Sequence, residues 1–434
     1  MITPPPGVSL AGYFEPRPNR GVLDELYARV CLFRQGEEIG GILELDLLYA
    51  PRWLCDAVRE RLARRGHDGL ARNLLICAPH THTAPDPFPA ENPLRKHAHQ
   101  FIVEQAAAAV ATAMHRFVPA GVETGTVVNN PFAFNRRYWM RDGRVVTNPG
   151  KRNPEIVRPE GTVDRTIHFL RIQQFGRVAV VIANIVNHTD TIGGDLVSAD
   201  WPGFLERRIQ TALGRQCLVL PLVGPAGNIN HFDVTSDQDQ TCYAEARRIG
   251  EGYAEIILRA FDRARPLTPD FRTAVAELTL QKRRIPPEEI RAARQLLATS
   301  RESGAALTSE DLARGSPAVL RYFARSLLRF AETEAGKSVT VPLTGLRLGA
   351  EAAVVSLPGE PFTEIGLAIR EQSPFPATLI ASNANAQVGY IPLDESFDHG
   401  GYEPLPVPHG GVAKGSARAC IETATALLRK LAGT

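Results

Sequence analysis

The chain has 434 residues, of which 44% are hydrophobic and 22% charged, with a formal net charge of +2. These proportions are typical of a soluble globular protein, and the length allows one large core or two ordinary ones. Acidic and basic residues are interspersed, with no basic run or interleaved aromatic patch, so we expect no nucleic-acid surface. No apolar run approaches the length needed to cross a bilayer, so we expect no transmembrane segment.

The N-terminal stretch "MITPPPGVSL" lacks a basic region followed by an apolar core. We therefore expect no signal peptide and a cytoplasmic location. The six cysteines are scattered and form no CxxC pair. In a chain of this length, that usage favours reduced, mostly buried thiols.

Hydrophobic periodicity predicts strands and helices that alternate along most of the chain. In chain order, we expect strands at 26–33 and 40–48, a helix at 53–65, a strand at 74–77, a helix around 101–117, strands at 165–174 and 177–186, a helix at 201–213, a strand at 217–224, a helix at 243–261, a helical insertion at about 284–336, strands starting at 352 and 377, and a helix at 415–433. The hairpins among these strands favour an α/β fold of mixed β-sheets with flanking helices, in a single large domain over residues 1–434. Polar residues gather where strands end, so we expect a site at the C-terminal ends of the strands.

The stretch "LLICAPHTHTAPDP" places His80 and His82 where a buried strand ends. In an extended chain, residues i and i+2 point to the same side, so both imidazoles can face one metal ion or one substrate. From this motif alone, a pair of histidines in a polar loop is the more common interpretation, so the motif is weak evidence for a metal site. A metallo-β-lactamase-like HxHxDH motif is excluded, because Ala84 and Pro85 stand where its aspartate and histidine would be.

Five separated motifs, taken in order, are more specific than the histidine pair. They are "PHTHTAPDP", "NHTD…VSADWPGF", "GPAGNINHFD", "LPGEPFTEIGLAIR" and "SNANAQVGYIPLDESFDHGGYEP". Together with "ITPPPGVSLAGY" near the N-terminus, they resemble the catalytic domain of the neutral/alkaline, non-lysosomal ceramidase family. The chain ends soon after these motifs, and we expect no C-terminal immunoglobulin-like domain of the kind that members of the family carry.

The resemblance implies one zinc ion per chain, held by His80, His188, Glu360 and Tyr390. Two neutral imidazoles, a carboxylate and a phenolic oxygen are a ligand set that Zn²⁺ accepts. It further implies catalytic roles for His82, Arg136 and Tyr402 beside the scissile amide. His82 would donate to the developing oxyanion or move a proton, while Arg136 and Tyr402 would stabilise the developing negative charge.

The implied activity is zinc-dependent hydrolysis of the amide bond of an N-acyl compound by metal-bound water, with a role in lipid metabolism. The substrate is expected to be ceramide-like or a smaller N-acyl amine or amino acid, and no GxSxG elbow points to a serine nucleophile instead. A zinc esterase or lactonase on the same scaffold, and a non-catalytic ceramidase-like binding protein, stay open as alternatives. The native metal and the oligomeric state also stay open at this point.

Three polar residues outside these sets are also candidates. Asp46 interrupts an apolar strand, where it would either orient a ligand histidine or make a buried structural hydrogen bond. Asn228 and His231 belong to a loop that we expect to line the pocket.

Overall fold

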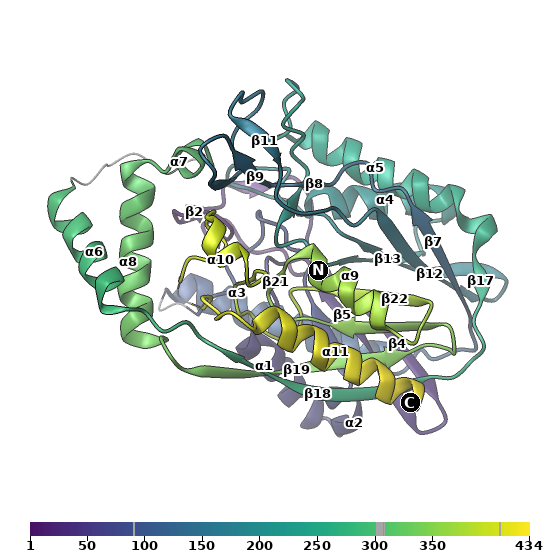
Figure 1. Cartoon of the computed structure of the whole chain (residues 1–434). Helices are drawn as coiled ribbons and strands as arrows, with labels where there is room; N and C mark the ends of the chain where they lie inside the picture. The colour runs from purple at the N-terminus through teal and green to yellow at the C-terminus, as the bar shows by residue number, and fades with distance from the viewer. Residues whose placement is uncertain (90–91, 301–306, 308, 408) are drawn as a thin grey trace.

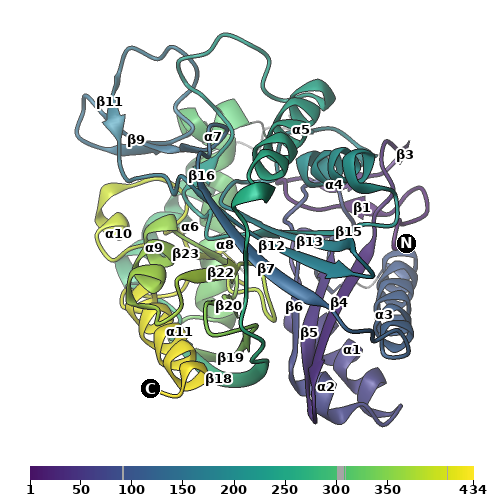
Figure 2. The ribbon, with the colours of Figure 1, turned by 90° about the vertical axis from the view of Figure 1, so that its right-hand side faces the viewer.

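The computed structural model describes residues 1–89, 92–300, 307, 309–407 and 409–434. It confirms the predicted mixed α/β fold in one domain, with three main sheets and flanking helices (Figures 1 and 2). All six cysteines lie in the described residues and none forms a disulfide. Among the described residues, no helix has both the length and the apolar character that a membrane span requires.

The largest sheet has five strands and separates two cores. Its order is β15 (Leu218–Val223), β13 (Arg177–Ile185), β12 (Thr166–Gln174), β7 (Gly121–Val128) and β17 (Arg265–Pro266). Helices α4 (Asp200–Leu213) and α5 (Tyr243–Arg259) cover one face (Figure 2). Buried Phe169 and Val181 of the sheet share that core with Trp201 and Tyr253 of the helices.

Two smaller sheets lie against the opposite face of the large one. One has the order β4 (Ala28–Gln35), β5 (Glu38–Leu45) and β6 (Leu74–Cys77), and the other β18 (Arg272–Gln281), β19 (Ser338–Arg347), β20 (Ala352–Ser356) and β22 (Ala377–Ala381). All three sheets contribute to the core between them, through residues such as Leu75, Ile182 and Leu379. The result is a layered arrangement of helix, sheet, sheet and helix.

Helices cover the outer faces of both smaller sheets. They are α1 (Arg52–Ala63), α2 (Asp68–Arg72) and α3 (Pro93–Ala113) on the first sheet, and α9 (Thr363–Gln372) and α11 (Ser416–Ala432) on the second. In α11, buried Cys420, Ala424, Leu427 and Leu431 recur every three or four residues, which places them on the face that packs against the sheet.

Each of the three sheets contains one parallel strand pair, and these pairs position the candidate site. The pairs are β5–β6, β13–β15 and β20–β22. The strands β6, β15, β20 and β22 consist mostly of Val, Ile, Leu and Ala and are buried almost throughout, as parallel strands generally are. Because the strands of a parallel pair end at the same edge, the segments that follow them come together.

Two buried asparagines join the sheets. The Asn184 side chain donates to the carbonyl oxygens of Leu222 and Ile380 and accepts from the Ile380 amide, which links the five-stranded sheet to β22. Asn385 accepts from the Ile76 amide at 3.2 Å and donates its backbone amide to the Ile76 carbonyl at 2.8 Å. These bonds satisfy backbone groups that the sheet ladders leave unpaired at the junction.

A helical excursion interrupts the long β18–β19 hairpin. The two strands pair from Arg272↔Arg347 to Gln281↔Ser338, and the chain between them forms α6 (Pro287–Thr299), α7 (Ser309–Arg314) and α8 (Pro317–Thr333). These helices lie in the range where an insertion was expected, although residues 301–306 and 308 of that range are outside the described residues. In Figure 1, α6 and α8 run side by side at the left edge of the molecule.

Short elements complete the structure. They are β1 (Ser9–Leu10), β2 (Arg17–Pro18), β3 (Gly21–Val22), β8 (Phe134–Asn135), β9 (Arg137–Met140), β10 (Val145–Thr147), β11 (Ile156–Pro159), β14 (Leu196–Val197), β16 (Ile229–Asn230), a 3-10 turn (Phe261–Arg263), β21 (Glu360–Pro361), β23 (Tyr390–Ile391) and α10 (Ser396–His399). The pair β21–β23 lies within the candidate site.

Replacing Asn184, which joins two sheets, is expected to lower the free energy of unfolding. Asn184→Ala leaves buried backbone groups of Leu222 and Ile380 without partners, so we expect a loss of about 2–4 kcal/mol in unfolding free energy. Asn153→Ala serves as the control, because it removes only a half-buried bond to the Pro149 carbonyl and an exposed bond from the Glu155 amide. It should cost under about 1 kcal/mol. Equal losses in urea titrations of the two variants would contradict the joining role of Asn184.

Candidate metal centre

The ends of the three parallel pairs deliver the candidate residues to one place. His80 follows β6, and His188 follows β13 by three residues. Glu360 follows β20 and Tyr390 follows β22, and these two residues are register partners in the short parallel pair β21–β23. Segments that lie far apart in the sequence therefore meet at the edge of the sheets.

Backbone and side-chain bonds hold His80 in one orientation. Its φ of 71° lies in the left-handed region, and its backbone amide donates to the Leu47 carbonyl at 3.0 Å. The imidazole Nδ1 lies 2.9 Å from the Leu48 carbonyl oxygen. Because a carbonyl only accepts, Nδ1 carries the proton and Nε2 is free to face the site.

Three buried imidazoles cluster here. One nitrogen from each of His80, His82 and His188 lies within 4.8 Å of the other two, which makes the group able to hold a metal ion. His82 Nε2 and His188 Nε2 are 3.2 Å apart. Burial lowers the pKa of both His82 and His188 well below 6.5, and nearby His80 and Arg136 lower it further. Both rings are therefore neutral at pH 7, as metal ligands must be.

Glu360 faces the same cluster. The Tyr49 hydroxyl donates to Glu360 Oε1 at 3.1 Å, and Oε2 lies 3.2 Å from His80 Nε2. Oε2 is buried and has no hydrogen-bond partner among the described residues. With the His80 proton on Nδ1, the lone pairs of His80 Nε2 and Glu360 Oε2 face each other, which is unfavourable in a buried site. Either a second proton on His80 or a metal ion between the two atoms makes the contact favourable. The donor set thus fits a divalent metal ion.

Tyr390 and Tyr402 lie under the Arg136 guanidinium, whose central carbon is 5.1 Å and 5.3 Å from the two ring centroids. Burial raises the pKa of Tyr390 well above 10, and Glu360 raises it further, whereas Arg136 opposes the shift. In the protein alone the Tyr390 phenol is therefore protonated, and a nearby metal ion is what would favour its ionised form.

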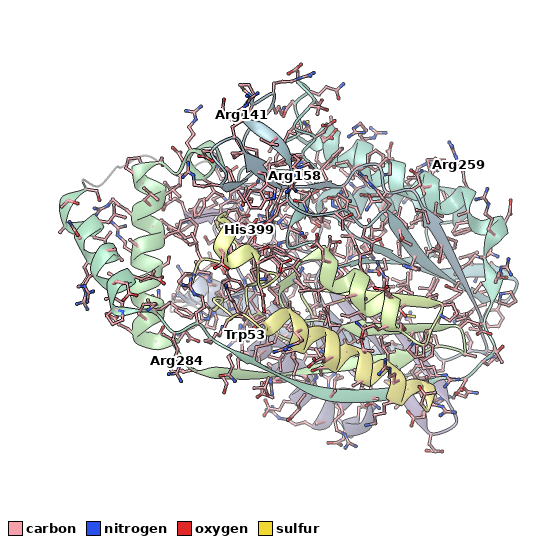
Figure 3. The ribbon with its side chains drawn as sticks, viewed as in Figure 1. Trp53, Arg141, Arg158, Arg259, Arg284 and His399 are labelled. Atoms are coloured by element: carbon pink, nitrogen blue, oxygen red, sulfur yellow. The ribbon has the colours of Figure 1, made fainter. Side chains whose placement is uncertain are left out.

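Arg136 is buried and fixed. Its Nε donates to Glu403 at 3.1 Å, and an Nη donates to the Gly227 carbonyl at 2.7 Å. Glu403 also pairs with the buried Arg137, so one carboxylate holds two arginines and anchors the loop that carries Tyr402. The same loop begins with α10, whose His399 (Figure 3) has its Nδ1 2.9 Å from Glu160.

A cavity of about 530 Å³ encloses the cluster. Its lining includes all seven residues that the sequence singled out: His80, His82, Arg136, His188, Glu360, Tyr390 and Tyr402. A larger cavity of about 820 Å³ lies between β4 and the C-terminal end of α3 and contains none of them. The structure thus brings the predicted set together, while the role of each member stays a prediction.

The structure adds residues that sequence reasoning missed. Tyr49 bonds to Glu360, and Asp190 lies 3.5 Å from His82 Nδ1 while accepting from the Tyr13 hydroxyl at 2.6 Å. Asp190 stands two residues after His188 in the quoted motif, and Tyr49 follows β5 as His80 follows β6. For both residues, the available sequence signal was a position shortly after the end of a predicted strand.

Of the three other candidates, none lines the cavity. Asp46 pairs with Arg29 at 2.6 Å, which makes it part of a buried structural network. Asn228 bonds to Glu364 and to the Thr363 amide, and His231 bonds to the Gln240 carbonyl. Their loop still reaches the cavity, through Asn230.

Metal content distinguishes a metal site from a protonated His80–Glu360 pair. We expect about one divalent metal ion per chain in purified protein, and its loss in His80→Gln and in His188→Gln, because each removes a nitrogen ligand. The control is His168→Gln, a buried histidine of β12 that bonds to Thr126 outside the cavity. Metal-free wild-type protein after growth with added zinc, by mass spectrometry, would contradict the site.

His168 also predicts a pH dependence of stability. Burial lowers its pKa from 6.5 to about 4, so the unfolded chain takes up the proton first as pH falls. Unfolding free energy is fully present above pH 6.5 and decreases towards pH 4, by roughly 3 kcal/mol from this group. Urea titrations of metal-free protein should show a shallower decrease in His168→Gln than in wild type. Parallel pH curves would contradict the effect.

Comparison with known proteins gives a consistent result for the fold. No protein-family model and no curated protein sequence matches the chain. The crystal structure of neutral ceramidase from Pseudomonas aeruginosa matches over 99% of this chain and 73% of that one, with a TM-score of 0.71 and 16% identity. A structure described as ceramidase complexed with C2 matches over 99% and 74%, with a TM-score of 0.72 and 15% identity. The chain therefore has a neutral-ceramidase-like fold.

Proposed function

We propose that this protein is a metal-dependent hydrolase that cleaves the carboxylic amide bond of an N-acyl compound. The observation that carries the proposal is the convergence of seven side chains of four chemical types, from motifs far apart in the sequence, on one cavity. Its cluster of imidazoles with an unpartnered carboxylate oxygen fits a metal ion. The ceramidase-like fold supports amide hydrolysis as the reaction class.

Zinc is the metal that this ligand set suits best, with His80, His188, Glu360 and Tyr390 as its ligands. When bound, such an ion supplies Lewis acidity that polarises a carbonyl and lowers the pKa of water. Tyr49 keeps one oxygen of Glu360 engaged, so that the other faces the cluster. The Leu48 carbonyl accepts a hydrogen bond from His80 Nδ1, which leaves Nε2 unprotonated and facing the cluster.

Arg136 and Tyr402 are proposed to bind the substrate carbonyl oxygen as negative charge develops on it. Arg136 is held by Glu403 and the Gly227 carbonyl, so little reorganisation is needed when the charge forms. Burial raises the pKa of Tyr402 well above 10, which keeps its hydroxyl a hydrogen-bond donor at neutral pH. Arg136 and Tyr402 are thus assigned to stabilising the charge on the carbonyl oxygen, and neither is assigned to proton transfer.

His82 is proposed to move the proton to the departing amine. Its lowered pKa keeps the imidazole neutral and able to accept a proton at pH 7, and Asp190 lies 3.5 Å from the opposite ring nitrogen. That carboxylate would stabilise the cationic form that proton transfer produces. The proposal keeps His82 outside the ligand set, although it lies within reach of His188.

The His82→Gln variant tests whether His82 transfers a proton without binding the metal ion. We expect it to retain its metal and to lose roughly 10²–10⁴-fold in kcat on an N-acyl amide, because general acid–base catalysis is removed. Tyr402→Phe should also retain metal and lose about 10–10³-fold in kcat, since one charge-stabilising donor is removed.

Wild-type protein is assayed on short-chain ceramides, N-acyl amines and N-acyl amino acids, each beside the ester of the same acyl group. Loss of metal in His82→Gln would show that His82 is a metal ligand. Turnover of esters without amides would favour the esterase alternative. A metal-loaded wild type that hydrolyses neither class would contradict the proposed function.

A further inference from the structure

Helix α8 supplies one wall of the cavity. Tyr322, Arg325, Ser326 and Arg329 all line it, and their spacing of i, i+3, i+4 and i+7 places them on one helical face. In Figure 3, the labelled Arg284 marks where the chain leaves β18 for the helical insertion that carries this wall. The insertion therefore reaches the site through α8.

The acidic and basic residues that line the cavity come from different elements. The two acidic lining residues, Asp190 and Glu360, lie at the histidine cluster and are engaged there by Tyr13, Tyr49 and His80. The α8 wall instead contributes two arginines, Arg325 and Arg329.

Arg329 is the cation on which the inference rests. It is solvent-exposed, and no carboxylate in the described part of the chain forms an ion pair with it. Its charge lowers the pKa of His409, another residue of the lining. Lys282 lowers that pKa as well, whereas Glu334 raises it. By contrast Arg136, the remaining arginine of the lining, forms an ion pair with Glu403.

The same wall is apolar beside the arginines. The Phe14 ring packs edge-on against Tyr322 at 4.9 Å and Phe323 at 6.4 Å, and all three residues line the cavity. An apolar surface next to an unpaired guanidinium is complementary to a molecule that joins a hydrocarbon stem to an anion.

We propose that Arg329 selects N-acyl substrates that carry a carboxylate or similar anion several bonds away from the scissile amide, in preference to neutral ceramide-like amides. This inference rests on the proposed function, because it names the substrate class of the same cavity. An exposed guanidinium costs nothing when a neutral substrate binds, so the preference comes from attraction to the anion. A charge-assisted contact at such a position gives an advantage of about tenfold, which salt weakens.

The test uses three amides with the same dodecanoyl group. Their amine halves are ethanolamine, which is neutral, glycine, whose carboxylate adjoins the amide, and ε-aminocaproate, whose carboxylate is remote. We expect kcat/KM for the aminocaproate amide to exceed that for the ethanolamide by about tenfold, with the glycine amide between them. Arg329→Gln should bring all three within about twofold by raising KM for the anionic amides, with kcat unchanged.

Two matched variants accompany Arg329→Gln. Arg329→Lys keeps a positive charge and should retain most of the preference. Arg291→Gln, at an exposed position of α6 that does not line the cavity, should leave it unchanged. Equal kcat/KM values for the neutral and the remote-anion amide in wild type, or the same preference in wild type and Arg329→Gln, would overturn the inference while leaving amide hydrolysis established.

Binding to chelator-treated, metal-free protein supplies a readout that does not need turnover. Calorimetry should show tighter binding of the aminocaproate amide than of the ethanolamide, and the difference should vanish in Arg329→Gln. If this difference is found and the metal-loaded enzyme hydrolyses no amide, the proposed function fails and the selectivity stands. If hydrolysis is found but binding does not depend on the anion, the selectivity fails and the function stands.

Discussion

The meeting of three parallel strand pairs at one edge is the constraint on which the structure depends. β-Strands end where their ladder bonds end, so the segments after β6, β13, β20 and β22 are free to turn and present side chains. Asn184 and Asn385 hold the sheets together by satisfying backbone groups at the junction. Without that junction, His80, His188 and the paired Glu360 and Tyr390 would lie at the ends of three separate sheets.

Burial then determines what these side chains can do. Removing water keeps the imidazoles of His82 and His188 neutral and the phenols of Tyr390 and Tyr402 protonated. It also makes the contact between Glu360 Oε2 and His80 Nε2 unfavourable unless a cation compensates it. Arg136 pairs with Glu403 and makes no hydrogen bond to Glu360 Oε2, so it does not supply that cation.

The sequence predicted the parts of the site that follow buried strands. Short apolar runs followed by polar motifs placed His80 and His188 at strand ends, and the resemblance of the motifs to the ceramidase family implied Glu360 and Tyr390 as further ligands. The α/β class followed from the same apolar runs. Strands β7 and β18 were missed because half-exposed residues interrupt their apolar pattern. Tyr49 and Asp190 follow strand ends, but that position alone does not show which side chains enter the site. The α8 wall was missed because its place in the site depends on contacts between distant segments, for which local periodicity carries no signal.

The central claim is that the residues gathered at this junction form one metal centre of nitrogen and oxygen ligands. X-ray anomalous scattering at the zinc edge, on crystals of zinc-loaded protein, tests it most directly. The account predicts one strong peak in the cavity, about 2.0–2.2 Å from His80 Nε2, a His188 nitrogen, Glu360 Oε2 and the Tyr390 oxygen. A cavity without a peak, or an ion held by the three histidines with Glu360 and Tyr390 remote from it, would contradict the account.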